Sequence, residues 1–133
     1  MKKKLNIIVV GLGYVGMSNA IILSQHNSVK AVDIDKTRIS LLKDSKSPIE
    51  DKLIFNYLLN KKLDIEAILL DKIDYGIADF VIIATPTNYD EKTNSFDTTS
   101  VEMLIKQVLI NNNRATIIIK STVPVGFTEK VRS

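Results

Sequence analysis

The sequence predicts an α/β protein built on a doubly wound parallel sheet. Short apolar, β-branched runs alternate with longer helical patterns, as expected for parallel strands joined by right-handed crossovers. A glycine-rich turn follows the first of these runs, and an acidic residue ends the second. The 133 residues are enough for one domain, and a composition of 45% hydrophobic and 25% charged residues is ordinary for a globular protein.

The first predicted strand, residues 5–10, leads into a helix over about 14–25 through a glycine pattern. The pattern reads Gly11-Leu12-Gly13-Tyr14-Val15-Gly16. Gly11 permits a tight turn because it has no Cβ. Gly13 would let a pyrophosphate approach the backbone, and Gly16 would let the helix pack closely against the strand. This order predicts the dinucleotide-binding turn of a Rossmann-type fold; a turn that merely tolerates glycine is the alternative.

Backbone N–H groups at the start of this helix, those of Tyr14 and Val15 among them, would face the phosphates of a dinucleotide. The second predicted strand, 28–33, ends at Asp33, 22 positions after Gly11. Roughly 20 residues normally separate such a turn from the ribose-binding acid. A carboxylate there accepts hydrogen bonds from both ribose hydroxyls and repels a 2′-phosphate, which predicts NAD over NADP. The alternative is that Asp33 only caps the next helix.

The segment between the second and fourth strands contains a helix, an insertion and a third strand. A helix is predicted over about 36–44, with Asp35 as its N-cap. A further helix over about 50–60 precedes a strand over about 66–70, and a short helix is predicted over about 72–76.

The fourth and fifth strands, about 79–84 and 115–120, flank a helix predicted over about 98–111. Its apolar stripe is formed by Val101, Leu104, Ile105 and Val108. The asparagines at 111–113 are expected to end it by adopting a left-handed conformation. The predicted strand order is 3-2-1-4-5, with the sixth strand of a full Rossmann sheet missing or beyond the end, so we expect a truncated sheet.

Two loops leave the carboxyl ends of the fourth and fifth strands, at the edge where open α/β sheets bind ligands. The loop after residues 79–84 is long and polar, as functional loops often are. Thr85 and Thr87 in this loop, and Thr122 in the loop after residues 115–120, are predicted near the nicotinamide end of a cofactor. Ordinary turn and capping chemistry is the alternative.

Composition argues against several classes of function. The net charge is +3 and the lysines are not interleaved with aromatic residues, so nucleic-acid binding is not expected. The absence of cysteine excludes disulfides, thiolate metal sites and a cysteine nucleophile in this chain. No metal site is predicted, since no histidines and carboxylates have ligand spacing. No apolar run reaches roughly 18 residues, so we expect no membrane segment and a cytoplasmic protein.

Several other residues are assigned ordinary structural roles. His26 is the only histidine and follows the first helix, where it is expected to complement the helix dipole rather than act as a base. Met17, Met103 and the phenylalanines are expected to be packing residues.

Four blocks of sequence carry a family resemblance. They are Gly11-Leu12-Gly13-Tyr14-Val15-Gly16, Val32-Asp33-Ile34-Asp35, Ala84-Thr85-Pro86-Thr87 and Lys120-Ser121-Thr122-Val123-Pro124-Val125-Gly126. In this order they resemble the N-terminal NAD-binding domain of the UDP-glucose dehydrogenases, within the nucleotide-sugar dehydrogenase family. The resemblance spans essentially the whole chain. It implies a cytoplasmic enzyme of polysaccharide biosynthesis that is a homodimer at full length.

The resemblance also implies roles for individual residues. Arg38 occupies the position of a lysine that reaches the adenosine ribose in many members, and Thr122 would help to hold a water at the reacting centre. The predicted cofactor-binding residues are Gly11, Gly13, Tyr14, Val15, Gly16, Asp33, Arg38, Thr85, Pro86, Thr87 and Thr122.

The family's reaction is a two-step oxidation of a sugar C6 alcohol to a carboxylate, with reduction of two NAD. A cysteine captures the intermediate aldehyde, and the thioester is then hydrolysed by water. The cysteine and most UDP-sugar contacts come from regions C-terminal to this domain, which the resemblance implies are absent here. The chain is therefore expected to bind NAD and to be inactive alone, with the UDP-sugar bound only by the full-length enzyme.

Two alternatives remain open at this point. A sibling enzyme acting on UDP-N-acetylmannosamine or GDP-mannose would share the same cofactor domain. A stand-alone nucleotide-sensing module, such as the cytosolic regulatory domains of potassium transporters, would begin with a similar turn and acid. Such modules would not be expected to carry both the Ala-Thr-Pro-Thr and Ser-Thr-Val-Pro-Val-Gly blocks.

Overall fold

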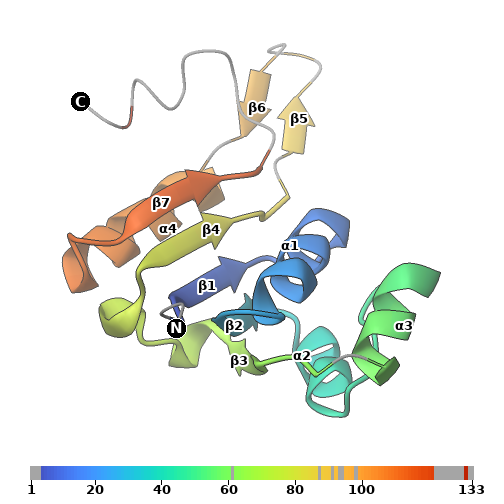
Figure 1. Ribbon diagram of the computed structural model, residues 1–133. Helices are drawn as coiled ribbons and strands as arrows, with labels where there is room; N and C mark the ends of the chain where they lie inside the picture. The colour runs from blue at the N-terminus through green and yellow to red at the C-terminus, as the bar shows by residue number, and fades with distance from the viewer. Residues whose placement is uncertain are drawn as a thin grey trace.

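A five-stranded parallel sheet forms the centre of the computed structural model (Figure 1). The structure describes residues 4–60, 62–86, 88–90, 92, 95–97, 99–121 and 131. The strands are β1 (Asn6–Val10), β2 (Ser28–Asp33), β3 (Ile65–Leu69), β4 (Phe80–Ile83), β5 (Asn88–Asp90), β6 (Ser95–Asp97) and β7 (Thr116–Ile119). The helices are α1 (Tyr14–Ser24), α2 (Lys36–Lys43), α3 (Lys52–Asn60) and α4 (Thr99–Asn111), with 3₁₀ turns η1 (Leu70–Lys72) and η2 (Tyr75–Ile77). The main sheet has the order β3-β2-β1-β4-β7, which confirms the predicted Rossmann-type fold and its 3-2-1-4-5 order.

The strands of the main sheet are apolar because helices or turns cover both of its faces. Successive residues of a strand point to opposite faces, so Ile8 and Val10 of β1 pack on one side, while Ile7 and Val9 pack on the other. The first side also contains the buried stripe of α4 and residues from η2. The second contains buried residues of α1, while α2 and α3 extend that layer toward β3. In Figure 1, α4 lies behind β4 and β7, on the far side of the sheet from α1.

The predicted short helix over 72–76 was wrong. The segment forms η1 and η2 instead, separated by Ile73 and Asp74 in extended conformations. The Asp74 side chain accepts a hydrogen bond from Gly76 N at 2.8 Å and begins η2. This connection between β3 and β4 therefore contains two single 3₁₀ turns and no α-helix.

The polar segment after β4 contains structure that the sequence did not predict. β5 and β6 pair antiparallel as a separate two-stranded sheet, with Tyr89 opposite Phe96 (Figure 1). The segment had been expected to be a loop, because its short polar stretches carry little of the alternation that marks a strand.

Asparagine side chains do end α4, but not in the way expected. None of the residues 111–113 has a positive φ. Asn112 Nδ2 donates to the carbonyl oxygens of Tyr75 and Ala78, both at 2.9 Å. Its Oδ1 accepts from Arg114 N at 3.0 Å and Ala115 N at 3.1 Å. One side chain thus joins the β3–β4 connection to the α4–β7 connection.

A second side chain acts at the same, amino end of the sheet. Asp79 precedes β4, and its Oδ2 accepts from Asn6 N at 2.9 Å. Its backbone N–H donates to Asn6 O at 2.7 Å. The entry to β1 is therefore fixed to the entry to β4 by groups within the protein.

Tyr75 is a tyrosine almost fully buried in the core on the α4 side, with 4% of its surface exposed. Among the residues that the structure describes, its hydroxyl is a buried polar group without a hydrogen-bond partner. Burial raises the pKa of the Tyr75 hydroxyl above its ordinary value. The ring contributes packing, while the hydroxyl opposes folding because it loses its hydration.

Replacing Tyr75 by phenylalanine should therefore maintain the free energy of unfolding or raise it by about 1 kcal/mol, as urea titration would show. In the original chain stability should fall above about pH 10, because the unfolded tyrosine ionises there while the buried one stays protonated. Tyr75→Phe should remove that part of the decline, and Tyr14→Phe, at an exposed position, should not. A lower stability for Tyr75→Phe at neutral pH would contradict this account.

Candidate dinucleotide-binding site

The candidate site lies where β1 and β4 run side by side and the helices that follow them leave to opposite faces of the sheet. This is the switch point at which open α/β sheets bind ligands. A cleft of about 690 Å³ opens beyond the carboxyl ends of the strands. Its lining includes Gly11, Asp33, Arg38, Thr85, Pro86 and Met103.

The glycine turn is held in contact with two neighbouring backbone segments. Gly11 has a φ of +99°, and a Cβ there would lie 2.7 Å from the carbonyl carbon of Ala84 and 2.8 Å from Thr85 N. A Cβ at Gly16 would lie 1.6 Å from Gly11 O. The predicted steric requirements at Gly11 and Gly16 are therefore confirmed: the turn, and the packing of α1 against it, need glycine.

Gly13 differs from these two glycines. A Cβ added to it would meet no atom within 4 Å, and its φ of −78° is open to any residue. The packing of the described chain does not require glycine at this position.

The start of α1 carries backbone donors without acceptors in the helix. The first helical hydrogen bond runs from Met17 N to Gly13 O at 2.9 Å, so the N–H groups of Tyr14, Val15 and Gly16 precede it. Gly13 is the N-cap and offers no side-chain cap, and the first turn has no acidic residue. The positive end of the helix dipole is therefore not offset by side chains of α1 itself.

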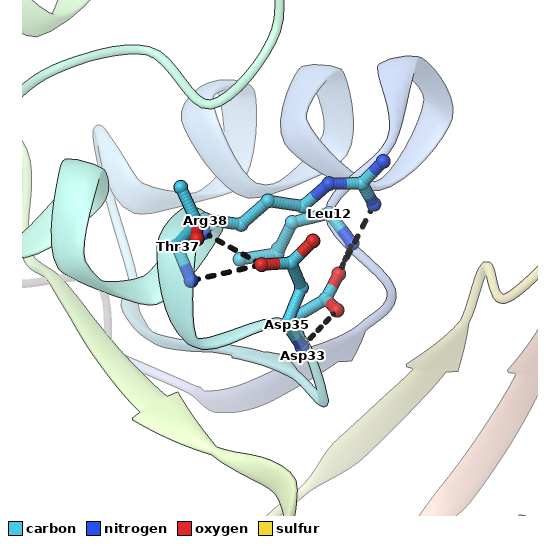
Figure 2. Close-up of polar contacts among 5 residues, drawn as sticks. All are labelled: Leu12, Asp33, Asp35, Thr37 and Arg38. Atoms are coloured by element: carbon cyan, nitrogen blue, oxygen red, sulfur yellow. Dashed lines mark hydrogen bonds and ion pairs between the residues drawn. The ribbon is translucent and has the colours of Figure 1, made fainter.

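Asp33 connects the end of β2 to the glycine turn (Figure 2). Its side chain is buried, with 6% of the residue exposed. Oδ2 accepts from Leu12 N at 2.8 Å, and Oδ1 accepts from Asp35 N at 2.9 Å. The second bond is local and resembles a cap, whereas the first crosses from β2 to the turn after β1. Asp33 is thus more than a cap for the next helix.

The guanidinium of Arg38 lies over this carboxylate. Its Nη1 is 3.4 Å from Asp33 Oδ2, and the Arg38 side chain is partly exposed to the cleft (Figure 2). Asp35 fixes the turn that presents Arg38, because Asp35 Oδ1 accepts from Thr37 N at 2.8 Å and Arg38 N at 3.3 Å. The prediction that Asp35 is the N-cap of α2 is confirmed.

The remaining predicted residues divide into those that the structure describes and those that it does not. Thr85 and Pro86 line the cleft. Thr87 and Thr122 lie outside the described residues, so their placement stays a prediction. His26 is exposed in the turn after α1, with its N–H donating to Leu23 O at 3.3 Å.

The structure also adds residues that the sequence reasoning missed. Met17 is buried, in agreement with its predicted packing role. Met103 is 57% exposed and lines the cleft, so the prediction that it is a packing residue was wrong. Met103 lies off the predicted apolar stripe of α4, which was a usable signal. Ser121 was named only as part of a block; its hydroxyl donates to Thr85 O at 2.6 Å. That contact joins residues 36 positions apart and has no local signal.

The described ranges contain neither a metal-binding cluster nor a membrane-spanning helix. Within them, no three histidine, aspartate or glutamate side chains gather closely enough to hold a metal ion. None of the helices described combines the length and the apolar character needed to cross a bilayer.

Comparison with known proteins shows the family. Residues 5–133 match the NAD-binding domain of the UDP-glucose/GDP-mannose dehydrogenase family. The UDP-glucose 6-dehydrogenase of Streptococcus pneumoniae is 46% identical over 128 residues, covering 96% of this chain and 32% of that protein. The UDP-glucose 6-dehydrogenase of Campylobacter jejuni is 43% identical over 130 residues, covering 96% of this chain and 33% of that protein. The chain thus spans about a third of the length of these relatives.

Solved structures agree with this assignment. The UDP-D-ManNAc dehydrogenase of Pyrococcus horikoshii superposes with a TM-score of 0.81 at 26% identity, covering 95% of this chain and 30% of that one. The UDP-N-acetyl-mannosamine dehydrogenase of Staphylococcus aureus gives 0.76 at 27% identity, covering 95% of this chain and 32% of that one. The chain therefore belongs to the UDP-glucose/GDP-mannose dehydrogenase family and corresponds to its NAD-binding domain, with NAD as the cofactor.

Proposed function

We propose that this chain is the NAD-binding portion of a UDP-glucose 6-dehydrogenase, which converts UDP-glucose, two NAD and water to UDP-glucuronate and two NADH. The cofactor site is supported chiefly by the turn at Gly13. A Cβ at this glycine would meet no atom of the described residues, and the N–H groups beside it precede the first hydrogen bond of α1. The choice of sugar is supported by relatives of that name at 46% and 43% identity. Relatives named UDP-N-acetyl-D-mannosamine dehydrogenase are 26–28% identical, which makes that substrate the second candidate.

The two ends of the cleft would take different parts of the cofactor. The pyrophosphate would lie over Gly13 and the N–H groups of Tyr14 and Val15, where the helix dipole favours negative charge. The adenosine ribose would bond to Asp33, since a carboxylate has about four lone-pair sites and only two are taken by the close backbone donors. Arg38 would hold that carboxylate in place.

The nicotinamide end of the cofactor would lie on the side of β4 and β7. Thr85 and Pro86 line the cleft there, and we propose Thr87 and Thr122 as further contacts. Bound NAD would supply the hydride acceptor, and Thr122 would help to hold a water. The chain has no cysteine, so it cannot supply the nucleophile of a thioester step. The full-length enzyme, which we propose to be a cytoplasmic homodimer, would provide that residue and bind the UDP-sugar.

The 133-residue chain should bind NAD and should not form NADH from UDP-glucose. Calorimetric titration with NAD would measure the first property, and absorbance at the NADH band during incubation with both compounds would measure the second. Circular dichroism of the same sample would establish that it is folded. Steady NADH production by the purified chain would contradict the proposal that essential groups lie elsewhere.

Gly13→Ala should weaken NAD binding by tenfold or more, about 1.4 kcal/mol, because its methyl group would occupy the approach of the pyrophosphate. It should leave the free energy of unfolding unchanged or slightly higher, since the backbone conformation suits alanine. Gly16→Ala is the matched control and should destabilise the fold itself, because its Cβ collides with Gly11 O. Unchanged NAD affinity in Gly13→Ala would contradict the proposed phosphate site.

Asp33→Asn should reduce the preference for NAD over NADP by about tenfold or more, since a charge-assisted hydrogen bond is worth about 1.5–3 kcal/mol and the repulsion of a 2′-phosphate is also lost. Arg38 would then be free to pair with that phosphate, so adding Arg38→Ala should reverse the gain for NADP. Asp35→Asn is the matched control, because asparagine also caps helices, and should leave the ratio of the two dissociation constants unchanged. An unaltered ratio in Asp33→Asn would refute the assignment of Asp33.

A further inference from the structure

The hydroxyl of Ser121 joins the two chain segments that leave β4 and β7. Ser121 Oγ lies 2.6 Å from Thr85 O, to which it donates, and 3.4 Å from Ile83 O. The Thr85 hydroxyl lies 3.5 Å away. The backbone supports this position, because Lys120 N and Ser121 N both donate to Ile83 O, at 2.7 and 3.2 Å. The exit from β7 is thus bonded to the last residue of β4 and to the segment after it.

The same segment is held from its other side by the glycine turn. Ala84 N donates to Val10 O at 2.8 Å, which continues the pairing of β4 with β1. The Ala84–Thr85 peptide then lies against the Cα of Gly11, so closely that a Cβ there would be 2.7 Å from the Ala84 carbonyl. This peptide is therefore fixed between Gly11 on one side and Ser121 on the other.

We infer that Ser121 is a positioning residue for the nicotinamide half of the cofactor, an inference that rests on the proposed binding site. Thr85 and Pro86 line the cleft after β4, which is separated by β1 from β2 and the Asp33 at its end. When the adenosine ribose is bound at the end of β2, the other half of the dinucleotide crosses β1 toward β4. Thr85 and Pro86 form one wall of the cleft, and the Ser121 hydroxyl fixes the position of this wall. Ser121 thereby controls how well the nicotinamide half of the cofactor fits.

Because of where Ser121 lies, its effect on cofactor binding can be measured separately from any effect on the stability of the fold. It is partly exposed at the edge of the sheet and does not belong to the buried core. Alanine would leave Thr85 O without the hydroxyl donor but would retain the backbone bonds to Ile83 O. The wall could then move away from Gly11 while the sheet stayed intact. Threonine would keep the hydroxyl and should keep the wall in place.

Calorimetry with NAD and with ADP, on the original chain, Ser121→Ala, Ser121→Thr and Ser40→Ala, tests this inference. ADP carries the adenosine and pyrophosphate but lacks the nicotinamide half. Ser121→Ala should weaken NAD binding about three- to tenfold, the equivalent of one hydrogen bond, and change ADP binding by less than about twofold. Ser121→Thr should restore NAD binding. Ser40→Ala, an exposed position on α2, should match the original chain with both ligands.

Other results would overturn the inference. Parallel weakening of NAD and ADP in Ser121→Ala would indicate a general structural effect, and unchanged binding of both would indicate no role. A failure of Ser121→Thr to restore NAD binding would show that the hydroxyl is not the determining group. Absence of NAD binding by the folded original chain would instead refute the proposed site itself, which distinguishes the two failures.

Discussion

The close approach of backbones around Gly11 is the constraint on which the candidate site depends. Gly11 N donates to Val32 O at 2.8 Å, Gly11 O faces the Cα of Gly16, and the Gly11 Cα faces the Ala84–Thr85 peptide. Three chain segments from β2, α1 and β4 therefore meet at one residue. Any side chain there would separate them, and the cleft exists with its present shape because none is present.

Asp33 adds an electrostatic element to this steric one. A buried carboxylate loses the hydration of its charge, and this loss has to be compensated. Here two backbone N–H groups and a guanidinium compensate it. Because one of those donors belongs to Leu12, the same side chain that we propose for the ribose also supports the glycine turn, where we propose that the phosphates bind. In the proposed binding mode, recognition of the two parts of a dinucleotide would therefore be coupled through a single buried group.

The sequence predicted the sheet and the helices beside it well, since buried parallel strands are continuous apolar runs and crossovers have one hand. It also predicted why Gly11 and Gly16 are needed, because those reasons are local. It failed for η1 and η2, where the Asp74 side chain ends the extended segment, and for the β5–β6 hairpin, whose strands are short and polar. The bonds donated by Asn112 Nδ2 and Ser121 Oγ could not be predicted, since they join residues brought together only by the sheet order. Thr87 and Thr122 stay predictions.

The Asn112 side chain has a consequence for how this fold can diversify. Together with Asp79 it satisfies backbone groups at the amino edge of the sheet with partners from the protein itself. The carboxyl edge differs, because the glycine at position 13, the N–H groups at the start of α1 and the residues that follow β4 line an open cleft or lie beside it. Selection should then act on substitutions at the amino edge through their effect on folding. It should act on substitutions at the carboxyl edge through their effect on ligand binding in the cleft. Descendants of one ancestral domain could exchange the carboxyl-edge loops while inheriting the amino edge unaltered.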